Sequence, residues 1–153
     1  MTRTTAREIA ILLGFSAAAD GESTEEVLDR FFEREHYESL GEENELFAEY
    51  PDARQMDYIR TLVKLIAEHR TELDGYIERY AQGWKASRIS RTAAAVLRCA
   101  MCEILWIPDV PEAAAINEAV ELAKKYEDAE TVSFINGVLG GFVRGREQKT
   151  EEE

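Results

Sequence analysis

Residues 90–126 have the sequence SRTAAAVLRCAMCEILWIPDVPEAAAINEAVELAKKY, and this stretch decides the fold class. Ser90 is a preferred helix N-cap residue, and the apolar positions after it predict a helix to about Trp106. A proline disfavours helical backbone in the residue before it, so the first helix ends just before Pro108. Pro111 suits the first turn of a second apolar helix, which fills the rest of the stretch.

The remainder of the chain also predicts helices, because no segment alternates polar and apolar residues between two sets of turn residues. Two capping boxes mark helix starts, Ser23 with Glu26 and Asp52 with Gln55. Gly41 is expected to end the helix that Ser23 begins. The expected helices cover residues 4–19, 23–40, 44–50, 52–67, 71–82, 90–106, 111–126 and 130–144. Eight short helices with short links are typical of a compact all-α fold and not of a coiled coil.

Length and composition describe one globular domain. The chain has 153 residues, of which 45% are hydrophobic, too many for a disordered acidic chain. Two cysteines exclude a disulfide-rich secreted scaffold and favour a reducing compartment. No apolar run reaches the roughly 18–20 residues that a membrane span needs, so no membrane association is expected.

Charge is divided unevenly along the chain. The net charge is −13, and residues 20–50 alone hold 12 acidic and 2 basic residues. Residues 79–102 hold five basic residues and no acidic one. The overall balance argues against a general nucleic-acid binder, whereas the basic stretch leaves a local RNA site open.

The N-terminal segment shares some features with a secretory signal peptide. Arg3 and Arg7 precede the apolar run Ile9–Phe15, and three alanines follow it. Glu8 adjoins this run, which has only seven residues. We therefore favour a first helix of the mature fold over a cleaved leader.

The motif Cys99-Ala-Met-Cys102 is a CxxC, but it lies nine residues after Ser90 and not at a helix start, where redox motifs lie. The two cysteines are interpreted as small core residues. His36 and His69 have no partner at metal-ligand spacing, so no metal site is predicted. The chain shows no Ser-His-Asp set, phosphate loop or nucleotide fingerprint, so neither an enzyme nor a cofactor is expected.

Four polar, aromatic or glycine positions have both a structural and a binding interpretation. Gly137 lies in a helical pattern and favours close helix packing, whereas Asn136 before it stays undecided between packing and ligand contact. Asn117 interrupts an apolar helix, where a buried hydrogen bond is preferred over a binding role. Trp84 suits a plug between two helices better than stacking on a nucleobase.

Four blocks of this chain, in this order, resemble the NusB family. They are ARE at 6–8 in the first helix, WKASRISR at 84–91, AINEAVELAK at 115–124 and FINGVL at 134–139. The third block is the most specific, and the resemblance extends over about residues 4–143.

The resemblance implies an all-α, NusB-like compact fold of two small bundles, an N-terminal three-helix lobe and a C-terminal four-helix lobe. We therefore expect a single domain over residues 1–146, with lobes at about 1–82 and 83–146. An acidic disordered tail is expected over residues 147–153. Because the family is bacterial, the cytoplasm is the expected location.

The resemblance also implies a function, namely a transcription antitermination factor. Family members bind the boxA element of ribosomal RNA leader transcripts with a small-subunit ribosomal protein, NusE, in the RNA polymerase antitermination complex. The RNA-binding residues implied here are Arg3, Arg7, Ser133, Phe134 and Asn136. The acidic residues expected to face the basic ribosomal protein are Glu118, Glu121 and Glu130. Some members self-associate, so a homodimer stays open.

A second hypothesis follows from the short basic N-terminus. Family members have an arginine-rich segment ahead of the first helix, whereas this chain has only Arg3 and Arg7 there. Each lost phosphate contact weakens RNA binding, with a salt slope of about −0.7 per phosphate for single strands. The alternative is a NusB-fold protein-interaction module that has lost most RNA affinity and acts through its acidic lobe. Convergence of the two N-terminal arginines with Arg88 and Arg91 on one face would favour RNA binding.

Overall fold

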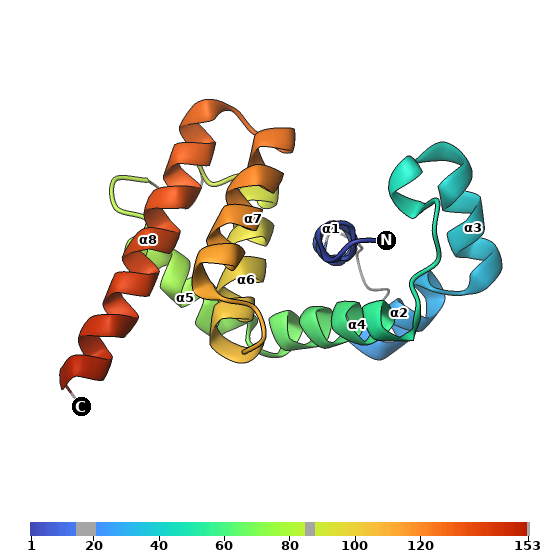
Figure 1. Cartoon of the computed structure of the whole chain (residues 1–153), viewed down its shortest axis with the longest axis horizontal. Coiled ribbons are helices and arrows are strands. Elements are labelled where there is room, and N and C mark those ends of the chain that lie inside the picture. The colour runs from blue at the N-terminus through green and yellow to red at the C-terminus, as the bar shows by residue number, and fades with distance from the viewer. Residues whose placement is uncertain (15–20, 85–87, 153) are drawn as a thin grey trace. The chain divides into compact units, whose positions relative to one another are not determined.

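The computed structural model describes residues 1–14, 21–84 and 88–152, and these residues are helical or lie in links between helices (Figure 1). The elements are α1 (Arg3–Leu13), α2 (Thr24–Phe31), α3 (Arg34–Glu43), the short 3-10 helix η1 (Glu45–Phe47), α4 (Ala53–Glu68), α5 (Arg70–Tyr80), α6 (Arg91–Trp106), α7 (Glu112–Tyr126) and α8 (Ala129–Glu152). No strand occurs in the described ranges, and the predicted all-α class is confirmed.

The chain divides into two compact units, Met1–Glu68 and His69–Glu153. α5 belongs to the second unit, since it packs on α6 and α8. The sequence placed the boundary between lobes near residues 82 and 83, after α5. The structure therefore divides the chain one helix earlier than expected.

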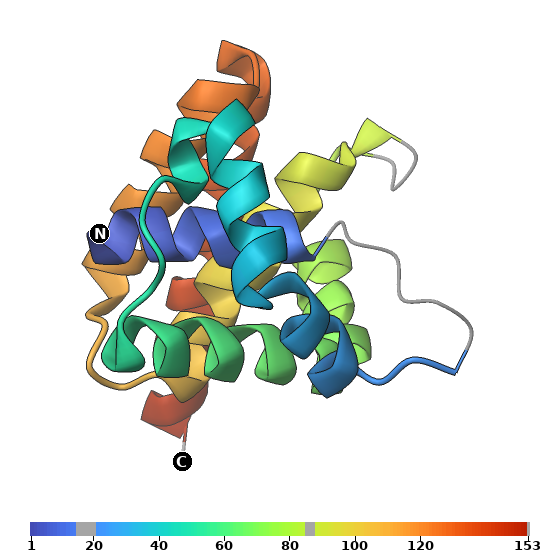
Figure 2. The same cartoon turned by 90° about the vertical axis from the view of Figure 1, so that its right-hand side faces the viewer.

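In the first unit, α1 packs on α4, which also supports α2 (Figure 2). Ile9 of α1 and Ile59 and Leu62 of α4 are fully buried, at 0% exposure. The predicted capping box at the start of α4 is confirmed. The side chain of Asp52 accepts the N–H of Gln55 at 2.8 Å, and the side chain of Gln55 accepts the N–H of Asp52 at 3.0 Å.

Aromatic rings fill the space between α2, α3 and η1. The rings in mutual contact belong to Phe31, Phe32, Tyr37, Phe47 and Tyr50. Tyr37 is 1% exposed, and its hydroxyl donates to the carbonyl of Glu49 at 2.9 Å. Burial raises the pKa of Tyr37 to about 12. Because its hydroxyl is hydrogen-bonded, the polar end of Tyr37 is satisfied although the ring lies in the core.

The helix expected over residues 23–40 is interrupted. Ser23 caps α2 as predicted, since its side chain accepts the N–H of Glu26 at 3.1 Å. α2 then ends at Phe31, and Glu33 begins α3 by accepting N–H groups of its first turn with its carboxylate. A second capping residue inside the segment therefore accounts for two helices where one was expected.

The prediction that Gly41 ends its helix is wrong, because α3 continues to Glu43. A Cβ atom on Gly41 would lie 2.6 Å from the carbonyl oxygen of Phe47. The glycine is therefore needed for the close approach of η1 to α3. The first helix also differs, since α1 ends at Leu13, and residues 15–19 of the expected helix lie outside the described residues.

In the second unit, α6, α7 and α8 pack side by side, and α5 packs on α6 and α8 (Figure 1). Ser90 caps α6 as predicted, accepting the N–H of Ala93 at 3.0 Å. α8 contributes Ile135, Val138, Leu139 and Phe142 to the core, all at 2% exposure or less. Their spacing of three, four and seven residues places them on one face of the helix.

Glycine packing in α8 differs from the prediction. A Cβ on Gly137 would meet open space, so close helix packing at this residue is wrong. The close approach occurs further along α8, where a Cβ on Gly141 would lie 3.2 Å from the ring of Tyr80 and one on Gly145 would clash with it. The backbone of α8 also continues to Glu152, through residues that favour helix, where a disordered tail was expected.

Candidate nucleic-acid interface

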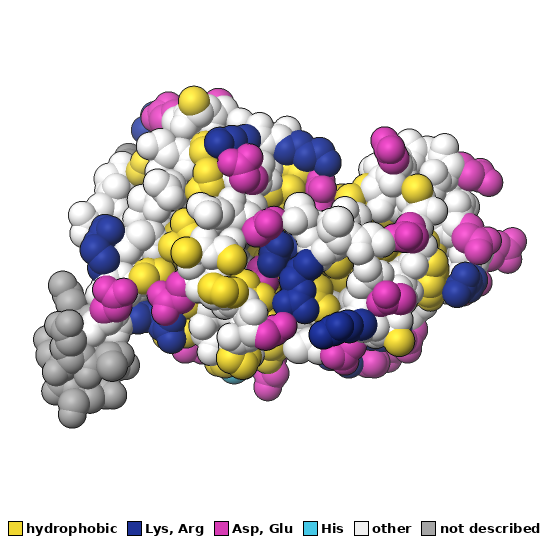
Figure 3. Space-filling view, viewed as in Figure 1, with side chains coloured by type: hydrophobic (Ala, Val, Ile, Leu, Met, Phe, Trp, Pro, Cys, Tyr) yellow, Lys and Arg dark blue, Asp and Glu magenta, His cyan; other side chains and the backbone are white. Residues whose placement is uncertain are grey.

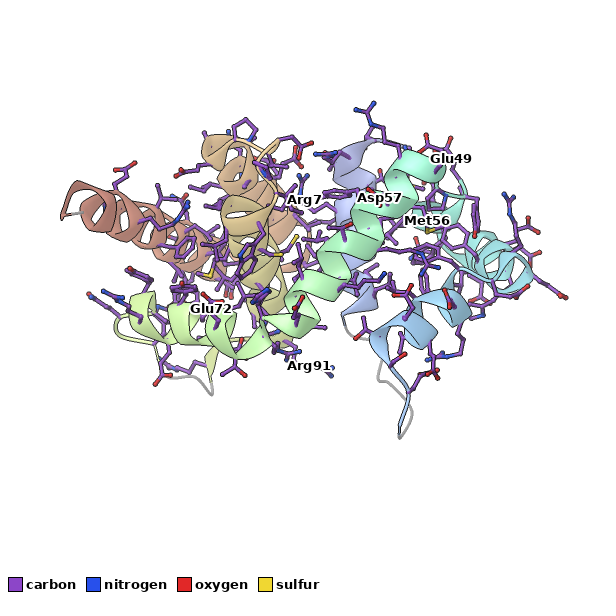
Figure 4. The ribbon with its side chains drawn as sticks, turned by 90° about the horizontal axis from the view of Figure 1, so that it is seen from below. Arg7, Glu49, Met56, Asp57, Glu72 and Arg91 are labelled. Carbon is purple, nitrogen blue, oxygen red and sulfur yellow. The ribbon has the colours of Figure 1, made fainter. Side chains whose placement is uncertain are left out.

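The two N-terminal arginines have different environments on α1. Arg3 is exposed, and its guanidinium carbon lies 4.5 Å from the centre of the Tyr58 ring on α4. This distance is typical of a cation–π contact. Arg7, one turn later on α1, is only 5% exposed (Figure 4). Arg3 therefore presents its charge at the surface, whereas the charge of Arg7 is withdrawn from solvent.

The three expected RNA residues of α8 lie close together at its first turns. Ser133 and Asn136 are exposed, and Phe134 is half-buried. The ring of Phe134 packs on Trp84, with 4.4 Å between ring centres and 31° between ring planes. Trp84 itself is half-buried. The structure thus joins two aromatic residues from distant blocks of the sequence beside two exposed polar side chains.

The helical period explains this grouping. The buried residues of α8 occupy one face, so Ser133, Asn136 and Gly137 lie on the opposite, exposed face. Phe134 lies at the edge between the two faces and reaches Trp84. Gly137 adds open space at this surface because it has no side chain.

The acidic residues expected to face a protein partner lie on or after α7. Glu121 and Glu130 are exposed, and Glu118 is half-buried. Glu121 pairs with Lys124 at 2.8 Å, one turn along the helix. Asn117 is exposed, so the preferred buried hydrogen bond at this position is wrong. Asn117 and Glu121 are four residues apart and share one face of α7.

The described acidic residues of segment 21–50 include a paired and an unpaired group. Glu25 and Asp29 of α2 pair with bases of α4, since Arg60 lies 2.9 Å from Asp29 and Lys64 lies 2.5 Å from Glu25. By contrast, several exposed carboxylates on and after α3 have no ion pair with another described residue. They are Glu35, Glu38, Glu42, Glu43 and Glu45. Acidic side chains accordingly gather over the α3 end of the first unit (Figure 3).

The basic stretch 79–102 is less available than its composition suggests. Arg98 pairs with Asp74 at 2.7 Å and joins α6 to α5. Arg88 and Arg91 are exposed, and Arg91 begins α6 (Figure 4). Lys85 lies outside the described residues. Arg88 and Arg91 belong to the second unit and the N-terminal arginines to the first, so neither unit holds all four arginines whose convergence would favour RNA binding.

The two cysteines are buried on α6, Cys99 at 1% and Cys102 at 0% exposure, and both are free thiols. Burial raises the pKa of Cys102 to about 12, so its thiol stays protonated near neutral pH. Their interpretation as core residues is confirmed. Among the described residues no cluster of three or more side chains suits a metal ion, and no helix is both long and apolar enough to cross a membrane.

One further feature could not be found from sequence motifs. A pocket of about 230 Å³ lies between α1 and α4 and is lined by Arg3, Ala6, Arg54, Gln55 and Tyr58. Arg54 and Gln55 are distant in sequence from Arg3, and no motif connects them. Only the packing of the two helices joins these residues at one surface.

Comparison with known sequences finds relatives along nearly the whole chain. The NusB family model matches residues 4–144. The transcription antitermination protein NusB of Acetivibrio thermocellus is 38% identical over 159 residues, covering 99% of this chain and 100% of that protein. The protein of the same name from Clostridium botulinum strain Kyoto is 34% identical over 143 residues, covering 94% of this chain and 100% of that protein.

Comparison with solved structures finds the same fold. NusB of T. maritima superposes with a TM-score of 0.66 at 22% identity, covering 94% of this chain and 92% of that chain. A chain from a crystal structure of a plectonemic RNA supercoil has a TM-score of 0.64 at 26% identity, covering 94% and 95%. These likenesses agree with the helical order described above.

Proposed function

Because this chain belongs to the NusB family of transcription antitermination proteins, we propose that it binds a boxA-like element of ribosomal RNA leader transcripts together with the ribosomal protein NusE. It acts in the cytoplasm, in the antitermination complex of RNA polymerase. Its contribution is binding and not catalysis.

The observation that carries this proposal is the aromatic pair of Trp84 and Phe134. Proteins recognise single-stranded RNA by stacking its bases on aromatic rings and by hydrogen bonds to the base edges. Both rings are half-buried, so each is held in place and still has an accessible edge or face. Ser133 and Asn136 are exposed beside them and carry both donors and acceptors.

The N-terminal arginines contribute unequally in this proposal. The exposed Arg3 contacts a phosphate of the RNA, since its guanidinium is at the surface. Arg7 is buried, so we assign it to the interior of the fold and not to direct phosphate contact. The RNA affinity of the protein alone is therefore modest, and the partner supplies additional positive charge.

We assign NusE binding to the exposed face of α7 and the start of α8. Glu118, Glu121 and Glu130 provide negative charge that suits a basic ribosomal protein. Asn117 shares a face with Glu121 and adds an exposed amide. The pair between Glu121 and Lys124 is exposed and weak, so it exchanges readily for a partner contact.

A protein-interaction module with little RNA affinity is the second candidate function. It is favoured by the burial of Arg7 and by the unpaired carboxylates on α3. A basic protein would bind this acidic surface, and association would weaken at high salt.

Fluorescence anisotropy with a labelled boxA RNA distinguishes the two functions. The protein is titrated alone and with equimolar NusE, each at two salt concentrations. We expect salt-sensitive binding that strengthens with NusE. Phe134→Ala should weaken binding roughly tenfold, as expected for the loss of one stacked base. Trp106→Ala is the matched control, because it removes another half-buried aromatic residue of the same unit, one that stacks on His69 and not on Trp84. No RNA binding in either mixture would contradict the proposal and favour the protein-interaction module.

A further inference from the structure

The pocket between α1 and α4 is a concave site on the first unit. Of the residues that line it, Arg3 already belongs to the proposed RNA site. Ala6 and Tyr58 are 1% and 7% exposed and form its floor. Arg3 and Arg54 are exposed and form its rim. None of the described residues that line it is acidic.

The guanidinium group of Arg54 has no structural role among the described residues. Its side chain makes no ion pair or hydrogen bond with any other residue in the described ranges. Asp52 is occupied as the cap of α4, where it accepts the N–H of Gln55 at 2.8 Å. Asp57, one turn after Arg54 on the same helix, is exposed and forms no ion pair with it (Figure 4). The charge of Arg54 is therefore available to a ligand.

The walls of the pocket are held in place before any ligand binds. The side chain of Gln55 accepts the N–H of Asp52 and donates to the carbonyl of Met1. Arg3 rests over the ring of Tyr58 at 4.5 Å. Such preorganisation lowers the entropy lost on binding.

The lining and the volume together define the ligand. Two guanidinium groups in one pocket repel each other, and an anion between them relieves that repulsion. Their planar forks match the oxygen atoms of phosphate. At about 230 Å³ the pocket is smaller than the roughly 300–1,000 Å³ of sites for whole drug-sized ligands. It suits one phosphate with part of its sugar, as part of a longer strand.

We propose that this pocket binds one backbone phosphate of single-stranded RNA and that Arg54 contacts it together with Arg3. The proposal rests on the RNA-binding function above and adds a residue to it. Arg54 also supplies part of the positive charge that the N-terminal segment lacks, since that segment has only two arginines.

The test compares two charge-removing variants of the same unit. Arg54→Gln removes one of the two guanidinium groups of the pocket. Arg34→Gln removes an exposed guanidinium of α3, which lies over the ring of Tyr50. With labelled boxA RNA and NusE, we expect Arg54→Gln to bind roughly tenfold more weakly and to lower the salt slope by about 0.7. Arg34→Gln should leave the slope unchanged. Equal effects of the two variants, or no effect of Arg54→Gln, would overturn the pocket assignment while the RNA function stands. Arg54→Gln should leave the melting temperature unchanged, because the Arg54 side chain makes no ion pair or hydrogen bond with another described residue.

A second measurement separates failure of the pocket from failure of the RNA function. NMR spectra of the ¹⁵N-labelled protein are recorded with inorganic phosphate and, separately, with the RNA. We expect both to shift the side-chain amide of Gln55 in the wild type, and neither to do so in Arg54→Gln. Shifts with phosphate alone would identify an anion site and overturn the assignment to RNA. No shift with either would overturn the pocket as a binding site.

Discussion

The two units differ in where most of their aromatic residues lie. In the first unit, aromatic rings form the core under α3, and Tyr37 is 1% exposed there. In the second unit, the core of α6, α7 and α8 consists mainly of aliphatic and small side chains, while Trp84 and Phe134 lie half-buried at its edge. Full burial gives Tyr37 and Phe142 a structural role, whereas Trp84 and Phe134 are half-buried beside the exposed Ser133 and Asn136, which makes them candidate binding residues.

The largest expected effect tests the aromatic core. Tyr37→Ala should lower the free energy of unfolding by about 4 kcal/mol, because it leaves a cavity under α3. Tyr37→Phe keeps the ring and loses only the hydrogen bond to Glu49, so it should cost about 1 kcal/mol. Guanidinium chloride denaturation measures both. Phe134→Ala should cost less than half as much as Tyr37→Ala, and an equal cost would make Phe134 a core residue and weaken its binding role.

A smaller effect on stability is expected at two helical glycines, one in each unit. Gly41→Ala should lower the free energy of unfolding by about 2 kcal/mol, because the backbone at Phe47 must shift to admit the methyl group. Gly137→Ala should raise it by up to about 1 kcal/mol, since the site is open and alanine favours helix. Thermal unfolding followed by circular dichroism checks both signs. Destabilisation by Gly137→Ala would restore the packing role that the sequence suggested.

The smallest effect concerns one acidic cap in each unit. N–H groups of His36 and Glu35 lower the pKa of Glu33, and the hydrogen bonds of Thr131 lower the pKa of Asp128. A carboxyl whose folded pKa is lowered stabilises the fold above its unfolded pKa and loses that contribution as pH falls through the folded pKa. Stability should therefore decline below about pH 4.5 for Glu33 and below about pH 3.8 for Asp128.

Paired variants measure these two contributions. The difference in melting temperature between wild type and Glu33→Gln, or between wild type and Asp128→Asn, should shrink as the pH falls from 6 towards 3. Glu38→Gln is the control, because Glu38 is exposed on the same helix as the Glu33 cap and has no ion pair with another described residue. A difference that stays constant with pH would show that the caps act through shape and not through charge.

Local signals in the sequence predicted local structure well. Ser23, Asp52 and Ser90 cap the expected helices, because an N-cap bond joins residues only two or three positions apart. The prediction failed at Gly41 and Gly137, where the role of a glycine depends on what approaches it from another element. Both α2 and α3 are rich in acidic residues. Among the described residues, the ones that form ion pairs with bases of α4 belong to α2.

By itself, the sequence determined that this chain is helical, that it belongs to the NusB family and that Phe134 and Asn136 are candidate RNA contacts. The helical class depends on hydrophobic period and capping residues, which act within a few residues, whereas the family and the candidate RNA contacts depend on the resemblance of four short blocks to that family. Only the tertiary structure decided that Arg7 is buried, that Trp84 packs on Phe134 and that Arg54 shares a pocket with Arg3. The reason is physical, because burial, ion pairing and pocket formation depend on which helix faces meet, and no local pattern of residues specifies that meeting.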